Sequence, residues 1–194
     1  MPRRATRGHN AGMLTLPHAS PDVPVLETER LRLRAQRLED FPLAAAMWAD
    51  ERVTRHTTGR ALTEEETWSR FLRSLGHWAF LGFGYWGVEE KSTGQYVGEM
   101  GFADLKRDMH PSLDGLPEMG WIFAPHIHGR GYATEAIRAA LAWGIPRFQP
   151  LRPVCLISSE NLASIHLAGK CGFREFQRTT YRGDRVILFR NDAA

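Results

Sequence analysis

The stretch that decides the fold is "HIHGRGYATEAIRAALAWG", residues 126–144, in which two glycines stand just before a segment with helical periodicity. A helix start presents unpaired N–H groups and the positive end of the helix dipole, and Gly129 and Gly131 allow the backbone to approach a ligand closely. The residues alone leave two interpretations open: an anion-binding helix start, or a plain turn between a strand and a helix. The apolar positions that predict the helix are Ala133, Ala136, Ile137, Ala140 and Leu141.

The common nucleotide-binding motifs do not fit this stretch. No lysine follows a glycine at the spacing of a P-loop. The dinucleotide pattern begins with Gly129 and Gly131, but Thr134 occupies the position of its third glycine. No acidic residue stands about 20 positions later, where a ribose contact would be expected. Both nucleotide interpretations therefore fail.

Helix and strand signals precede this stretch in a mixed order. The segment "TERLRLRAQ", residues 28–36, alternates leucine with arginine, as a half-buried strand does. A helix is predicted over 38–53, with Asp40 as its candidate cap, and a second over 63–75, which opens with a Thr-x-x-Glu capping box.

The remaining signals alternate between strand and helix. Further helices are expected from residue 132 and over 160–173, and a hairpin is expected to close the chain. The pattern predicts one α/β (α+β) domain in which helices pack on a mixed, largely antiparallel sheet. The expected strands are residues 85–90, 96–105, 116–125, 152–159, 173–180 and 185–190.

Composition limits the class of protein. A chain of 194 residues with 43% hydrophobic and 24% charged residues fits one globular domain, which we place at 25–194. Residues 1–24 are expected to form a flexible tail, and they lack the apolar core of a signal peptide. The two cysteines, Cys155 and Cys171, indicate reduced thiols and a cytoplasmic location rather than a disulfide framework.

Charge and hydropathy argue against two kinds of partner. The chain has 25 basic and 22 acidic residues, and Arg3, Arg4 and Arg7 precede the first acidic residue, Asp22, so 22 basic residues balance 22 acidic ones from there onward. Nucleic-acid binding is therefore disfavoured. No apolar run reaches the roughly 20 residues that cross a membrane, so no membrane partner is expected.

Two segments together carry a family resemblance. "WIFAPHIHGRGYATEA", residues 121–136, followed by "ENLASIHLAGKCGF", residues 160–173, resembles the GNAT superfamily of N-acetyltransferases, and most closely its RimJ/RimL branch. The resemblance extends over residues 25–190. It implies the GNAT fold, a central sheet of about seven strands flanked by about four helices. It also implies acetyl-CoA as the co-substrate.

The resemblance assigns cofactor contacts residue by residue. Main-chain groups of Trp121, Ile122 and Phe123 are expected beside the pantetheine, and Asn161 is expected to contact the cofactor or only to cap its helix. In the family, a [QR]-x-x-G-x-[GA] loop binds the pyrophosphate. The expected contacts in that loop and the following helix start are His128, Gly129, Arg130, Gly131, Tyr132, Ala133 and Thr134.

One position departs from the family pattern. His126 stands where the family usually has Gln or Arg, so a fixed donor or charge is missing near the phosphates. Arg130 is a candidate to compensate for this loss. His126 and His128 form an H-x-H pair, but no third ligand follows at a suitable spacing, so no metal site is expected.

The chemistry requires a neutral amine and a leaving thiolate. A lysine amine with a pKa of about 10.4 is almost wholly protonated at neutral pH, so a general base is useful. Strand alternation places Glu118 on one face with Gly120 and Ile122, and the resemblance gives Glu118 the role of base. The tyrosine acid of many relatives is replaced by Ala168, so Ser164 is expected either to donate a proton to the thiolate or only to pack.

The sequence therefore predicts an enzyme that moves acetyl from acetyl-CoA to a primary amine by direct transfer in a ternary complex. The alternative is a non-catalytic coenzyme A-binding regulatory module of the same fold. A protein N-terminus, an amino sugar, a polyamine and an antibiotic all remain open as acceptors, and the chain is expected to be a monomer or homodimer. The polar segment 54–67 and aromatic residues between 48 and 86 are candidates for the acceptor pocket.

Overall fold

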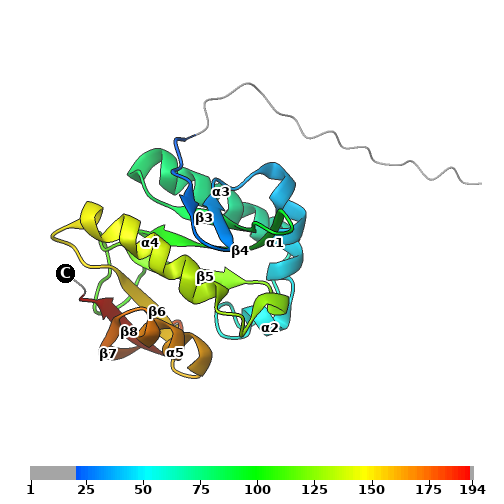
Figure 1. The fold of residues 1–194 in the computed structure, drawn as a ribbon. Coiled ribbons are helices and arrows are strands. Elements are labelled where there is room, and N and C mark those ends of the chain that lie inside the picture. The colour runs from blue at the N-terminus through cyan, green and yellow to red at the C-terminus, as the bar shows by residue number, and fades with distance from the viewer. Residues whose placement is uncertain (1–20, 193–194) are drawn as a thin grey trace, which may run out of the picture.

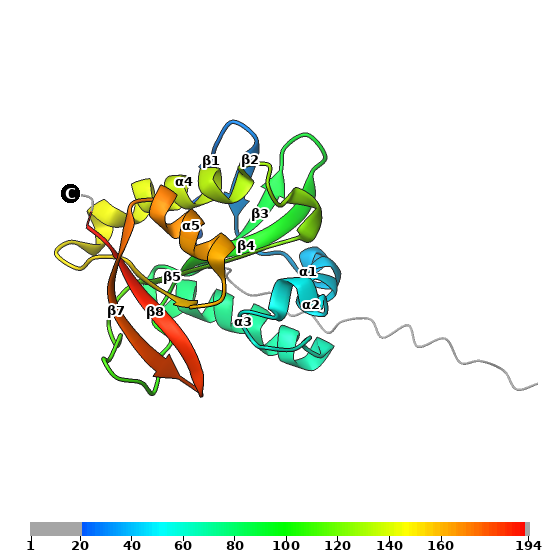
Figure 2. The ribbon, with the colours of Figure 1, turned by 90° about the horizontal axis from the view of Figure 1, so that it is seen from below.

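The computed structural model describes residues 21–192, which form one eight-stranded sheet with helices on both of its faces (Figures 1 and 2). The strand order is β1-β2-β3-β4-β5-β6-β8-β7, and within these residues only the β5–β6 pair is parallel. The strands are β1 Leu26–Glu27, β2 Leu31–Arg34, β3 Tyr85–Glu90, β4 Gln95–Ala103, β5 Glu118–Phe123, β6 Val154–Ser158, β7 Phe173–Tyr181 and β8 Asp184–Asn191. The helices are α1 Phe41–Trp48, α2 Glu51–Thr54, α3 Glu64–Leu81, α4 Tyr132–Phe148 and α5 Leu162–Lys170, with short 3-10 turns η1 Leu38–Asp40 and η2 Pro125–Ile127.

The predicted class is confirmed, with eight strands in place of about seven and five α-helices in place of about four. The additional helix comes from residues 38–53, which divide into α1 and α2. Asp50 has an extended backbone, and its side chain accepts a hydrogen bond from the Arg52 N–H, so it starts a new helix. Asp40 precedes α1 as predicted, but its carboxylate does not cap that helix.

Two residues before the predicted domain boundary at residue 25 contact the folded domain. Residues 1–20 of the predicted tail lie outside the described residues. Val23 packs against the core, and the Trp86 indole donates a 2.8 Å hydrogen bond to the Pro24 carbonyl oxygen. Residues 23 and 24 therefore belong to the folded domain.

The helices divide between the two faces of the sheet. Figure 2 shows α4 and α5 on one side and α1, α2 and α3 on the other. The α4 side is filled by aromatic rings, with Trp86, Phe102 and Trp143 in edge and stacked contacts 5.1–6.4 Å apart. The smaller α1–α3 side packs Trp48 and Phe71 over the sheet. Sheet residues on this second face therefore lie beneath one long helix, α3, and two short ones, α1 and α2.

Several local predictions are confirmed. Thr63 and Glu66 form the reciprocal capping box at the start of α3. The last two strands form the predicted hairpin, with Arg182 and Gly183 at positive φ in its turn. Cys155 and Cys171 are buried and unbonded to each other.

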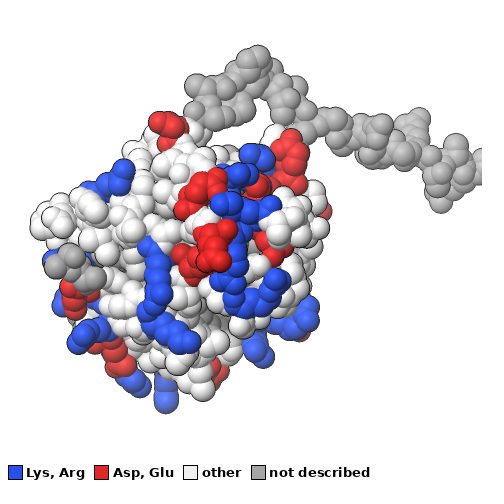
Figure 3. All heavy atoms as spheres, viewed as in Figure 1, with Lys and Arg blue, Asp and Glu red and all other residues white. Residues whose placement is uncertain are grey.

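Charged side chains on the surface are mixed in sign. On the face drawn in Figure 3, acidic and basic side chains lie beside each other. Glu27, for example, pairs with both Arg32 and Lys91. Among residues 21–192, no helix is long and apolar enough to cross a bilayer.

One buried charge cluster holds the start of the fold together. Arg34 on β2 is 4% exposed, and its guanidinium contacts Glu89 at 2.7 Å and Asp40 at 2.7 Å and 2.9 Å. Asp40 also accepts a 2.8 Å hydrogen bond from the Arg37 N–H. The carboxylate expected to cap α1 is therefore used to join β2, β3 and the η1 turn.

We expect Arg34→Met to destabilise the fold by about 3–5 kcal/mol, because it leaves the buried Asp40 carboxylate without its cation and removes one of the two arginines paired with Glu89. Chemical denaturation measures the loss. The control is Arg178→Met, which removes an exposed ion pair with Glu175 and should cost less than about 1 kcal/mol. Equal losses in the two variants would contradict the role of the buried cluster.

Candidate functional site

The site is built around a separation of two neighbouring strands. β5 and β6 are parallel, and their register contains only the pair Glu118 with Val154. Beyond that pair the strands diverge, and a cleft of about 720 Å³ lies at the separation. It is lined by residues of α3, β5, β6, the start of α5 and the β7–β8 turn.

Alternation along β5 sends its side chains to opposite faces of the sheet. Ile122 packs with Trp48 and Phe71 on the α1–α3 side, as the prediction for the Glu118, Gly120 and Ile122 face requires. Trp121 points to the other side, where its indole donates a 3.3 Å hydrogen bond to the Ser164 hydroxyl of α5. The cleft is therefore lined from both faces of the sheet.

The predicted phosphate loop has the backbone geometry that an anion cradle needs. Gly129 and Gly131 have φ of +75° and +80°, and Gly131 is the N-cap of α4. A Cβ at Gly129 would meet no atom within 4 Å, so only the backbone conformation favours glycine there. The first N–H groups of α4 have no acceptor within the helix and form a donor set for phosphate oxygens.

This loop is fixed by a residue that lies 100 positions earlier in the chain. Arg30 donates a 2.8 Å hydrogen bond to the Arg130 carbonyl oxygen. Its guanidinium also forms an ion pair with Glu135 of α4 at 2.7 Å. The cradle is therefore held in shape by the turn before β2.

The side chains of the loop have different environments. Tyr132 is buried and donates to Glu90 at 2.5 Å, and this hydrogen bond, together with burial, raises the pKa of Tyr132. The Arg130 guanidinium donates to the Tyr132 hydroxyl at 3.0 Å and is half exposed. Of Arg130 and Tyr132, only Arg130 therefore offers a positive charge to the cradle.

The two histidines of the loop, His126 and His128, have different contacts. His128 contacts the Phe123 carbonyl oxygen through Nε2 at 2.9 Å, which joins the end of β5 to the loop. His126 is exposed. Within the described part of the chain, no group of three or more His, Cys, Asp or Glu side chains is placed to hold a metal ion.

Glu118 is 5% exposed and is held by a partner that the sequence did not indicate. Arg107, from the loop after β4, donates two 2.7 Å hydrogen bonds to the Glu118 carboxylate. Burial alone would lower the pKa of Arg107, but the hydrogen bonds and charge of Glu118 raise it instead. Arg107 also lies over the Tyr181 ring at 4.9 Å. The carboxylate is fixed in direction, and its remaining lone pairs are left for a further donor.

Asn161 and Ser164 are adjacent at the start of α5. The Asn161 side-chain oxygen accepts a 3.1 Å hydrogen bond from the Ser164 N–H, so it caps the helix. Both residues line the cleft. Because the Ser164 hydroxyl accepts its hydrogen bond from Trp121, its own proton remains available for donation.

A tyrosine crosses two strands to reach the same cleft. Tyr85 of β3 pairs with Gly101, which in turn pairs with Gly120 of β5. A Cβ at Gly120 would overlap the Tyr85 hydroxyl oxygen. Burial, followed by the charge of Glu118, raises the pKa of Tyr85, so its hydroxyl keeps its proton. The glycines therefore make room for a neutral phenol beside Glu118.

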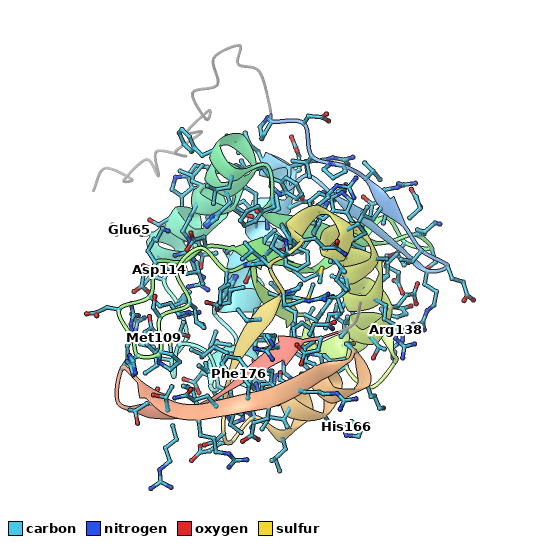
Figure 4. All side chains as sticks on the ribbon, turned by 90° about the vertical axis from the view of Figure 1, so that its left-hand side faces the viewer. Glu65, Met109, Asp114, Arg138, His166 and Phe176 are labelled. Carbon is cyan, nitrogen blue, oxygen red and sulfur yellow. The ribbon has the colours of Figure 1, made fainter. Side chains whose placement is uncertain are left out.

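The structure brings the predicted residues into two groups. Glu118, Trp121, Ile122, Asn161 and Ser164 line the cleft. The residues from His128 to Thr134, which are not among the cleft residues, form the loop and helix start; Phe123 ends β5 beside them. His166 lies at the outer surface of α5, as Figure 4 shows, away from both groups.

Sequence reasoning missed several residues of the cleft: Arg70, Glu99, Arg107 and Tyr181. They lie in segments predicted only as helix, strand, loop or hairpin turn, so no motif marked them. Tyr85 is one of the aromatic residues between 48 and 86 that were candidates for the acceptor pocket, and it lines the cleft. The register that pairs Gly101 with Gly120 could not be read from spacing along the chain.

Comparisons with known proteins show the family and the fold of this chain. The model of the acetyltransferase (GNAT) domain family matches residues 30–174. A putative GNAT-family acetyltransferase from Bordetella pertussis is 33% identical with a TM-score of 0.76, over 87% of this chain and 99% of its own. The protein YkkB of Bacillus subtilis is 31% identical over 84% of this chain and 91% of its own. The ribosomal L7/L12 acetyltransferase RimL, solved with coenzyme A, shares the fold at a TM-score of 0.67 and 14% identity, over 86% of this chain and 97% of its own.

We expect Gly120→Ala to destabilise the fold by about 1–3 kcal/mol, because its methyl group overlaps the Tyr85 hydroxyl. The double variant with Tyr85→Phe should recover most of this loss. Thermal unfolding of the two single variants and the double variant measures the coupling. Additive losses would show that the two side chains do not meet.

A second expectation concerns the cradle. Gly129→Ala forces a positive φ on alanine, at a cost of about 1–2 kcal/mol. We expect it to raise the KM for acetyl-CoA while Gly94→Ala, which has the same strain in the β3–β4 turn, leaves that KM unchanged. The same KM in both variants would remove the loop from the binding site.

Proposed function

The chain belongs to the GNAT acetyltransferase family, and on that premise we propose that it moves acetyl from acetyl-CoA to a primary amine by direct transfer in a ternary complex. The observation that carries the proposal is the position of Glu118 at the single register pair of β5 and β6, where the cleft begins. The acceptor is a peptide N-terminus or a small-molecule amine. RimL, which shares the fold, is named for acetylating an α-amine of ribosomal protein L7/L12.

The residues present fit coenzyme A in the cradle. Gly129 and Gly131 have the positive φ that opens the loop, and a Cβ at Gly129 would point into open space. We assign the pyrophosphate to the N–H groups from Gly129 to Thr134, with Arg130 supplying the charge that His126 lacks. The main chain of Trp121, Ile122 and Phe123 faces the separation from β6 and is assigned to the pantetheine.

Each step of the transfer has a candidate group on this chain. The amine nitrogen attacks the thioester carbon, so a C–N bond forms and the C–S bond breaks. Glu118 takes the amine proton, directly or through a water, while Arg107 keeps its carboxylate oriented. A β5 main-chain N–H stabilises the charge that develops on the carbonyl oxygen. Ser164 returns a proton to the departing thiolate.

The second candidate is a non-catalytic module that binds coenzyme A. The Arg107 fork favours it, because a carboxylate held in an ion pair has fewer free lone pairs for a proton than an isolated one. The two candidates share the cradle and differ in turnover.

The test is Glu118→Gln, assayed for thiol release against an amine library and for acetyl-CoA binding by calorimetry. We expect kcat to fall by about 10²- to 10⁴-fold because the base is lost, while the Kd for acetyl-CoA stays the same. Glu175→Gln, an exposed carboxylate on β7, should change neither value. A wild-type protein that binds acetyl-CoA and acetylates no amine would instead support the binding module.

A further inference from the structure

Arg70 of α3 lines the acceptor side of the cleft without a partner of its own. Its guanidinium lies over the Trp48 ring at 4.1 Å. Within residues 21–192, no carboxylate or carbonyl oxygen accepts a hydrogen bond from it, and its Nε is shielded from solvent. Burial lowers the pKa of Arg70, with a smaller contribution from the charge of Arg73. Arg70 is of intermediate exposure, but its buried Nε has no acceptor among these residues, and a buried donor without an acceptor is costly unless a ligand supplies one.

Two other arginines that line the cleft are paired. Arg60 pairs with Glu66, and Arg107 pairs with Glu118. Arg73 and Arg182 also line the cleft without an ion pair to any described residue, but both are exposed to solvent, whereas Arg70 is partly buried.

The nearest carboxylate does not fill this role. Glu99 lies close enough to influence the pKa of Arg70, but it accepts hydrogen bonds from Trp48, Gln36 and Tyr96. Its oxygens are therefore committed to neutral donors. The N–H donors of Arg70 therefore remain available to a molecule that binds in the cleft.

We propose that Arg70 binds the carboxylate of the acceptor, so that the substrate is a small amine that also carries a carboxylate, as an amino acid does. This inference rests on the proposed function and names its substrate class. A guanidinium presents two parallel donors that match the two oxygens of a carboxylate. The cleft volume of about 720 Å³ lies in the range of small-molecule sites.

The surrounding charges discriminate between ligand classes. A polyamine would meet Arg70 and Arg73, neither of which has an ion-pair partner in the described part of the chain, as like charges. A phosphate dianion would be repelled by Glu99 more strongly than a carboxylate, which has one negative charge. Arg70, Tyr85 and Glu118 line the same cleft. The carboxylate of one small molecule would therefore lie at Arg70 while its reacting amine lies at Glu118.

The experiment compares amines in matched pairs on the full chain. Amino acids and straight-chain ω-amino acids are assayed beside their carboxamides, the corresponding aminophosphonates, an acidic peptide and spermidine. The proteins are the wild type, Arg70→Met, Arg70→Lys and the control Arg178→Met. We expect a preference for the free carboxylates, and a KM for them that rises about 10- to 100-fold in Arg70→Met. The KM for acetyl-CoA should be unchanged, and Arg70→Lys should restore part of the loss.

Calorimetric titration of the same carboxylates into the coenzyme A complex separates this inference from the proposed function. Carboxylate binding that is lost in Arg70→Met, without any turnover, would support the anion site and remove the enzyme. Turnover with no preference for carboxylates, a preference for phosphonates, peptide or spermidine, or an unchanged KM in Arg70→Met would overturn the anion site and keep the enzyme. If the protein shows no turnover and no carboxylate binding, both the anion site and the proposed function are overturned.

Discussion

The site depends on the fact that two parallel neighbours, β5 and β6, share a single register pair. A continuous ladder would satisfy the backbone groups of both strands and close the sheet. Pairing with β6 stops after Glu118 and Val154. The main-chain groups of β5 that face β6 beyond this pair are therefore left to other partners, while the opposite side of the strand stays paired with β4. The same separation lets side chains from both faces of the sheet meet in one cleft. The early end of the β5–β6 pairing is therefore the feature that creates the cleft.

Local chemistry explains why much of the fold could be predicted from the sequence. The capping box at Thr63 and the positive-φ glycines Gly129 and Gly131 are specified by adjacent residues, so their patterns identify them without tertiary information. Alternation predicted which face of β5 carries Glu118. The order of elements, and the family resemblance of two segments, extended these local signals to the whole sheet.

Long-range charge pairing explains what could not be predicted. Arg34 continues the alternating polar side of its strand, yet it is buried because Asp40 and Glu89 surround it. Arg107 and Arg70 stand in segments that read only as loop and helix surface, and they acquire their roles by meeting β5 and Trp48. The spacing of residues along the chain does not indicate such long-range contacts. The ion pair with Arg107 that orients the Glu118 carboxylate was therefore not predictable from the sequence, whereas the position of Glu118 on its strand was.

The contact between Arg30 and the glycine loop has a further consequence for how the domain acquires its ligand. The Arg130 carbonyl and Glu135 are fixed by a residue about a hundred positions earlier, beyond the intervening β3, β4 and β5. The cradle is thus a property of the assembled sheet, and the loop sequence transplanted alone would lack its shape. Binding of the proposed ligand in the cradle would therefore be coupled to docking of the first strands, and each would stabilise the other.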